Sequence, residues 1–180
     1  MRVLFDDTVR VHYRQLYVES RESGTRGPSD PTEAFGMHNG MCGADIPGFL
    51  FLRTGKHSGY IALRIERHDT EPRPDDVWED IVEASFRPAT ATVQLMQWAG
   101  ERRWPLELEQ QHYRVRYHAY GMDFSEEGFD EPEEPDEHYL LQFWPARPEP
   151  DRVVRQQSRT AGQCNTDMPW SPRRGRDSES

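Results

Sequence analysis

Short stretches in which every second residue is apolar recur along most of this chain, and this period of two restricts the fold more than any other feature. In residues 59–67, positions 61, 63 and 65 are Ile, Leu and Ile, whereas positions 62, 64 and 66 are Ala, Arg and Glu. Such alternation is typical of a strand with one buried face. Residues 9–18 alternate in the same way and residues 78–86 do so less regularly, while residues 48–53, 92–98, 103–109, 113–120 and 139–144 are further stretches that suit strands. Since no stretch has a convincing helical period, we predict an all-β protein.

The spacing of these runs predicts how the strands are arranged. About eight strands joined by short turns favour an antiparallel β-sandwich over an alternating β-α arrangement. The apolar phase shifts after Gln15, which indicates a bulge or a change of buried face. The glycine-containing stretch 54–59 predicts a hairpin between the strands at 48–53 and 59–67. We expect one core, formed by Tyr13, Ile61, Leu63, Ile65, Val115, Tyr117, Leu141 and Phe143.

The C-terminal part of the chain differs from the rest in composition. Residues 147–180 are rich in Arg, Pro, Gln and Ser, and Val153 and Val154 form their only adjacent apolar pair. Such a segment buries too little apolar surface to offset the entropy of ordering. We therefore predict a β-sandwich domain over residues 1–146 and a tail over residues 147–180, disordered from about Asp151.

Targeting signals and cysteines bear on the cellular location. No apolar run approaches the roughly 20 residues needed to cross a bilayer, and the N-terminus lacks the order of basic, apolar and small residues of a secretory signal. Cys42 and Cys164 are far apart in sequence, and the second lies in the predicted tail, so we expect two reduced thiols. These features predict a cytoplasmic protein.

Charge is the strongest compositional signal. The chain has 32 acidic and 22 basic side chains, and residues 1–146 hold 27 of the acids but only 15 of the bases. An acidic body is repelled by nucleic acid and by anionic membranes, and it is attracted to basic proteins or cations. Direct binding of nucleic acid or of a membrane is therefore not expected.

Cys42 follows His38 by four residues in a glycine-rich stretch, which raises the question of a catalytic thiol. A catalytic pair is defined in space, however, and no residue that would orient the imidazole can be assigned from the sequence. The simpler interpretation is that Asn39 and Gly40 form a tight turn and that Cys42 packs as a small apolar residue. We adopt this interpretation and predict no catalytic residue.

The histidines and glycines form no known site pattern. Seven histidines are scattered without the paired spacing of a zinc site, and neither a phosphate-binding loop nor a Gly-x-Ser-x-Gly motif occurs. We therefore predict no metal ligand and no cofactor.

The acidic segment, residues 123–137, has nine acids in fifteen residues and no base. Three interpretations are open: a solvated loop, a calcium site completed by Asp69, Asp75 or Asp76, or a polyanionic surface with apolar anchors for a basic protein. The third interpretation assigns partner contacts to Asp123, Phe124, Glu126, Glu127, Phe129, Asp130 and Glu131.

Short motifs in three parts of the chain carry a family resemblance. They are residues 12–18, residues 40–45 with 54–59, and residues 113–117 continuing through 121–123 to 136–141. Together they resemble the competence protein J family, over about residues 9–145. The resemblance implies a small all-β cytoplasmic protein, and the namesake of the family inhibits a DNA-entry nuclease. The Pro-rich acidic insertion and the Arg-rich tail depart from the family pattern.

Charge and resemblance together lead to one expectation about function. We expect a noncatalytic acidic binding protein, an inhibitor or immunity-type partner of a nuclease or of another basic protein. The alternatives are a β-sandwich that binds calcium or a small ligand, and an enzyme that depends on Cys42 and a histidine.

Overall fold

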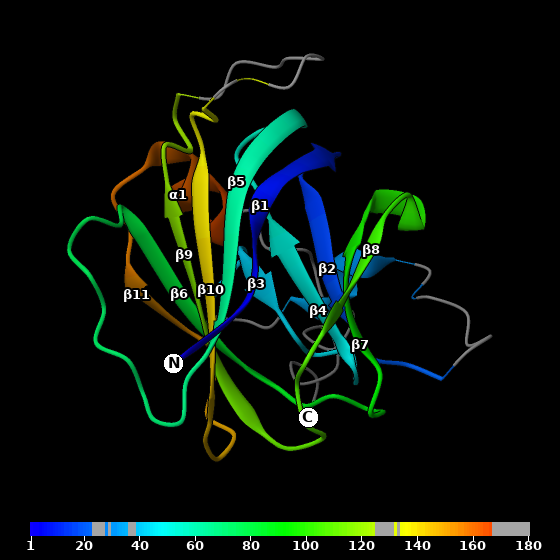
Figure 1. Ribbon diagram of the computed structural model, residues 1–180. Helices are drawn as coiled ribbons and strands as arrows, with labels where there is room; N and C mark the ends of the chain where they lie inside the picture. The colour runs from blue at the N-terminus through cyan, green and yellow to red at the C-terminus, as the bar shows by residue number, and fades with distance from the viewer. Residues whose placement is uncertain (23–27, 29, 36–38, 125–131, 133, 167–180) are drawn as a thin grey trace, which may run out of the picture.

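In the computed structural model, strands are the main regular secondary structure of the described residues (Figure 1). The structure describes residues 1–22, 28, 30–35, 39–124, 132 and 134–166. No helix in this part of the chain is long and apolar enough to span a bilayer. The elements are β1 (Arg2–His12), β2 (Gln15–Glu19), the 3-10 helix η1 (Pro31–Ala34), β3 (Cys42–Gly43), β4 (Phe49–Arg53), β5 (Ser58–Arg67), β6 (Asp80–Phe86), β7 (Val93–Gln97), the 3-10 helix η2 (Trp98–Gly100), β8 (Arg103–Leu106), β9 (Tyr113–Tyr120), β10 (His138–Pro145), β11 (Arg152–Arg155) and α1 (Arg159–Thr166).

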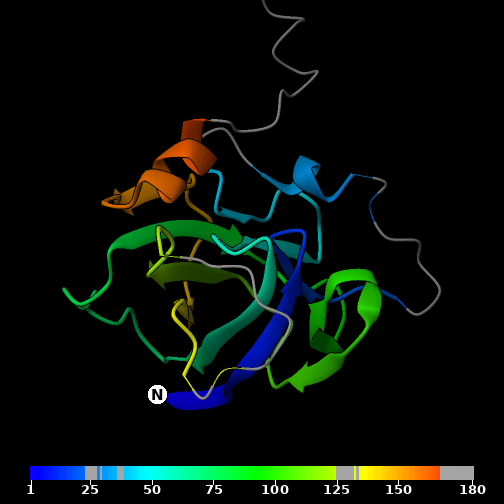
Figure 2. The same cartoon turned by 90° about the horizontal axis from the view of Figure 1, so that it is seen from above.

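The strands form one curled, mixed sheet with the shape of half a barrel (Figures 1 and 2). Nine strands follow one another in the order β11-β6-β9-β10-β5-β1-β2-β4-β3, while β7 pairs with β2 and with β8. Strands β5 and β10 are parallel, and the other described pairs are antiparallel. The all-β prediction is confirmed in part, since the described residues form a mostly β fold with one α-helix. The antiparallel sandwich is wrong, because alternation along a strand specifies its buried face and not its neighbour or direction.

The inner face of the curled sheet encloses the main core. Along β5 the burial alternates as the sequence predicts, with Ile61 and Ile65 fully buried and Leu63 at 1% exposure. A second, smaller aromatic cluster that includes Tyr17, Phe49 and Phe51 lies apart from it. The predicted core residues that are confirmed are Ile61, Leu63, Ile65, Val115, Tyr117, Leu141 and Phe143.

Tyr13 is the one predicted core residue that is wrong, since its side chain is 53% exposed. Tyr13 and Arg14 form a two-residue turn between β1 and β2, with φ of 55° and 60°. Two positive φ values give a hairpin turn that matches the twist of the strands, and Asn-Gly is the usual signal for it. Tyr-Arg lacks that signal, so the phase shift, predicted as a bulge or a change of buried face, comes from a hairpin turn.

The predicted hairpin between β4 and β5 is also wrong, because β4 pairs with β2 and β5 pairs with β1. The connection over residues 54–57 instead passes around the β1–β2 turn. It accepts a hydrogen bond from Arg14 N at His57 O and donates one from Thr54 N to Arg14 O. The strand positions follow from the sequence, whereas their pairing depends on residues far away in the chain.

The C-terminal part is ordered through residue 166, so the predicted disorder from Asp151 is wrong for residues 152–166. Strand β11 pairs with β6, and α1 buries Ala161 and Cys164 against the main core. Polar contacts add to this small apolar contribution: the buried Asp80 carboxylate accepts hydrogen bonds from the backbone N–H groups of Gln157 and Ser158, at 2.8 and 3.2 Å. Residues 167–180 lie outside the described residues.

A buried ion cluster joins β6, β9 and β11. Glu83, fully buried on β6, accepts hydrogen bonds from Arg116 Nε at 2.8 Å, Arg114 Nε at 3.2 Å and Arg152 Nε at 2.8 Å. Burial alone would raise the pKa of Glu83, but the bonds from Arg152 and Arg116 outweigh it and lower that pKa. The cluster therefore holds an ionised carboxylate at the point where β11 meets the sheet.

Candidate partner-binding surface

The acidic segment connects β9 to β10 at one end of the sheet. It leaves the sheet after Tyr120 and returns at His138, and these two residues are directly paired. The two ends of the acidic segment are thus held side by side.

Asp123 binds the first turn of α1. Its carboxylate accepts hydrogen bonds from Arg159 N at 3.0 Å and from Thr160 N at 2.9 Å, and a further bond from the Thr160 hydroxyl at 2.8 Å. Desolvation raises the pKa of Asp123, but these hydrogen bonds and the Arg159 charge outweigh it and leave the pKa lowered. Asp123 therefore fixes the start of the acidic segment to the C-terminal helix.

Two acids hold the other end of the segment. Asp136 pairs with Lys56 at 2.7 Å, and the Lys56 side chain is only 7% exposed. Glu137 is fully buried and accepts hydrogen bonds from Gly55 N at 3.1 Å and from the Tyr139 hydroxyl at 2.5 Å. A Cβ at Gly55 would lie 2.8 Å from Met122 O and 3.0 Å from Glu137 Oε1, so the close approach of residues 54–57 to the acidic segment and to Met122 before it requires glycine there.

The predicted contact residues thus differ in their surroundings. Asp123 is engaged within the protein, whereas the Phe124 side chain is 66% exposed. The others lie outside the described residues: Glu126, Glu127, Phe129, Asp130 and Glu131.

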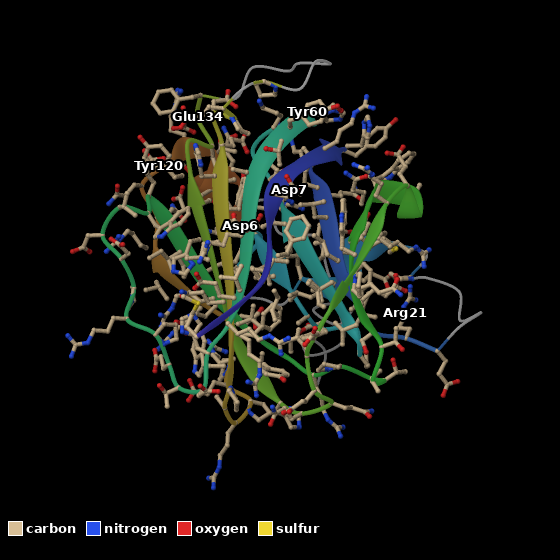
Figure 3. The ribbon with its side chains drawn as sticks, in the orientation of Figure 1. Asp6, Asp7, Arg21, Tyr60, Tyr120 and Glu134 are labelled. Atoms are coloured by element: carbon tan, nitrogen blue, oxygen red, sulfur yellow. The ribbon has the colours of Figure 1, made fainter. Side chains whose placement is uncertain are left out.

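Sequence reasoning missed a set of aromatic side chains at the same end of the sheet. Figure 3 shows Tyr60 and Tyr120 there, together with Glu134. The rings of Tyr120 and His138 are in contact, with centroids 6.2 Å apart. Both tyrosines fall in the polar phase of their strands, and an aromatic residue in that phase is the sequence signal that could have identified them.

Cys42 lies in the core and shows no exposed face. Its side chain is fully buried, and its backbone N–H donates to Asn39 Oδ1 at 2.7 Å. Burial, followed by the charge of Asp151, raises the pKa of the Cys42 thiol well above its usual value. His38 lies outside the described residues, and the structure supports the interpretation of Cys42 as a packing residue.

The described residues offer little for a metal ion. Among them, no group of three or more His, Cys, Asp or Glu side chains could hold one. Of the acids suggested to complete a calcium site, Asp76 pairs with Arg155 and Asp69 with Arg67. Burial lowers the pKa of His118 to about 4, so this imidazole is neutral at pH 7.

A groove of about 830 Å³ lies beside β2 and β7. Tyr17, Phe49, Met96 and Trp98 contribute to its lining, and Arg21 lies over the Phe49 ring at 5.7 Å from its centroid. Its volume is within the range of small-ligand sites.

Two solved structures are similar to this fold. The crystal structure of ComJ from Bacillus subtilis, described as an inhibitor of the DNA-degrading activity of NucA, superposes with a TM-score of 0.54 at 12% identity, covering 81% of this chain and 98% of ComJ. The protein therefore has a ComJ-like fold. A structure described as crocagin biosynthetic gene J gives a TM-score of 0.51 at 13% identity, with the same coverage of both chains.

The ComJ-like fold confirms the resemblance noted in the sequence, at the level of the fold. No protein-family model matches the sequence, and no curated protein matches it.

Proposed function

We propose that this protein is a noncatalytic acidic binding protein that inhibits a nuclease or another basic protein. A nuclease presents basic groups that hold the phosphates of its substrate. An acidic protein that covers those groups competes with nucleic acid, and long-range attraction raises its rate of association. In the cytoplasm such a partner would be kept inactive while the complex lasts.

The acidic segment carries this proposal. It concentrates nine acids between two paired strand ends, and Asp123 and Glu137 fix its start and finish. The ComJ-like fold supports the proposal because ComJ is described as a nuclease inhibitor. Internal contacts at both ends fix where the segment leaves and rejoins the sheet, which supports its use as a presented surface.

The test begins with capture of partners on the immobilised protein from an extract of its own cells at low salt. The retained proteins are assayed for DNA degradation, and the purified nuclease is then titrated with this protein. We expect inhibition in proportion to complex formed, and an affinity that falls steeply as salt screens the contact.

Neutralising four acids tests whether the acidic segment speeds association by attracting the basic partner from a distance. Changing Glu126, Glu127, Asp130 and Glu131 to their amides should slow association with the nuclease by about tenfold or more. The measurement is the association rate at low salt, with the melting temperature as a check on the fold.

A matched control makes the same change in net charge at the opposite end of the sheet. It replaces four exposed acids, Asp69, Glu107, Glu109 and Glu149, by their amides. If both quadruple variants associate equally slowly, net charge and not the acidic segment determines the rate. Failure to retain any nuclease would contradict the proposed inhibition.

The groove beside β2 and β7 favours a second candidate, the binding of a small ligand. A ligand seated between Tyr17 and Trp98 would raise the melting temperature with little dependence on salt. That response separates small-ligand binding from an electrostatic protein contact.

A further inference from the structure

The outer face of the sheet carries an apolar strip directly beside the acidic segment. His138 pairs with Tyr120 on one side and with Ala62 on the other, and directly paired residues project to the same face. Tyr60 lies two residues before Ala62 on β5, and Leu140 lies two residues after His138 on β10. Both therefore share that face. We name these five residues, Tyr60, Ala62, Tyr120, His138 and Leu140, the tyrosine strip.

The structure covers one half of this face and leaves the strip accessible. Further from the acidic segment, Glu66, Gln142 and Arg116 are all at most 7% exposed. There, Arg116 donates hydrogen bonds to Pro72 O and to Glu71, so the connection after β5 lies over this part of the sheet. In the strip, by contrast, Tyr120 is 40% exposed and the other four residues are half-buried.

The charges around the strip favour a basic partner. Glu134 is exposed near Tyr120, and the Asp6 side chain is 57% exposed on β1 (Figure 3). Arg64, which lies on the same face, is neutralised by Asp6 and by Glu66, and Arg10 beside Tyr60 is half-buried. The strip is thus an apolar centre beside the acidic segment, and the charges on its β1 side largely compensate one another.

We propose that the tyrosine strip is the contact surface on which a basic partner protein settles after the acidic segment has attracted it. This inference rests on the proposed function and locates the contact with the basic partner on the tyrosine strip. Tyrosines at the centre of an interface contribute much of its binding energy, and their rings also attract arginine and lysine side chains of the partner. The acidic segment then governs association, and the strip governs dissociation.

Two variants of the strip test this division with the nuclease retained in the capture experiment. Tyr120→Ala removes the most exposed ring, and Ala62→Arg places a long basic side chain in the middle of the strip. Each should raise the dissociation rate about tenfold or more and change the association rate by less than about threefold, because contacts at the centre of an interface act mainly on dissociation.

Tyr13→Ala is the matched control. Tyr13 is an exposed tyrosine on the β1–β2 turn, where it contacts His57 and Trp98, and it is not part of the strip. It should leave both rates unchanged, and all three variants should keep the melting temperature of the native protein to within a few degrees. Faster dissociation of both strip variants supports the surface. If they dissociate like the native protein while the quadruple acidic variant still associates slowly, the surface is refuted and the proposed function stands. Retention of no nuclease refutes both.

Discussion

Replacing Glu83 by Gln should destabilise the protein strongly, because Glu83 neutralises the buried guanidinium group of Arg114 and, together with Glu71, that of Arg116. The Glu83 side chain is 1% exposed, and those of Arg114 and Arg116 are 3% and 2% exposed. Glutamine keeps the shape of the side chain but removes its charge. Removing one partner of a buried ion pair costs about 3–5 kcal/mol, since the remaining charge stays buried without compensation. We expect a loss in this range for Glu83→Gln.

Urea unfolding measures the effect. With a denaturant dependence of about 2 kcal/mol per molar urea, the midpoint should fall by about 2 M at an unchanged slope. Glu71→Gln is the matched control, because Glu71 also binds Arg116, at 2.6 Å, but is 57% exposed. Because Glu71 is largely exposed and Glu83 still neutralises Arg116, this change should cost no more than about 1 kcal/mol. The reasoning is refuted if Glu83→Gln costs no more than Glu71→Gln.

Two further predictions concern titratable groups. Cys42 should react with iodoacetamide far more slowly than a free thiol at pH 8, because burial raises the pKa of its thiol. Labelling of the native protein is followed by mass spectrometry, and rapid labelling of Cys42 would contradict its place in the core. Burial alone would raise the pKa of Glu66, but hydrogen bonds from Arg64, and then from neighbouring side chains, lower it from 4.5 to about 2. The ionised form is therefore favoured by folding, so its contribution to stability is complete above about pH 4.5 and is lost as the pH falls toward 2. Glu66→Gln should flatten the fall in unfolding free energy between pH 4.5 and 2.5, and an unchanged slope would show that other carboxylates cause it.

Most strand positions and most of the core were predictable, because both follow from local alternation, but the start of β1, the short β3 and β11 were missed. Leu63 and Tyr117 are buried in the phase that the sequence indicates. The sheet order was not predictable, since the parallel pairing of β5 with β10 joins residues more than seventy positions apart. The Tyr13–Arg14 turn was missed because neither residue is typical of positive φ.

The C-terminal segment shows a different limit of sequence reasoning. Its composition predicts disorder because it offers few apolar side chains, yet Asp80 and Glu83 supply hydrogen bonds and charge that order residues 152–158. Those two acids lie about seventy residues earlier in the chain, where nothing identifies their partners. A local count of apolar residues omits stabilisation of this kind.

The candidate site was predictable only where it depends on local sequence. The acidic segment is visible as a charge run, but its composition does not show that Asp123 caps α1 or that Glu137 is buried. The aromatic neighbours are contributed by other strands, and only the register of β5, β9 and β10 brings Tyr60 and Tyr120 to one face.

The parallel pair of β5 and β10 also sets the order in which the sheet can be completed during synthesis. Strand β5 can pair with β1 as soon as both have left the ribosome, but its other edge has no partner until residues 138–145 emerge. During that interval the nascent chain presents an open strand edge, which is a template for pairing with other chains. The acidic segment emerges immediately before β10. Its negative charge is therefore present in the last stage in which the edge of β5 is open, and like charges on neighbouring chains oppose their pairing at that edge.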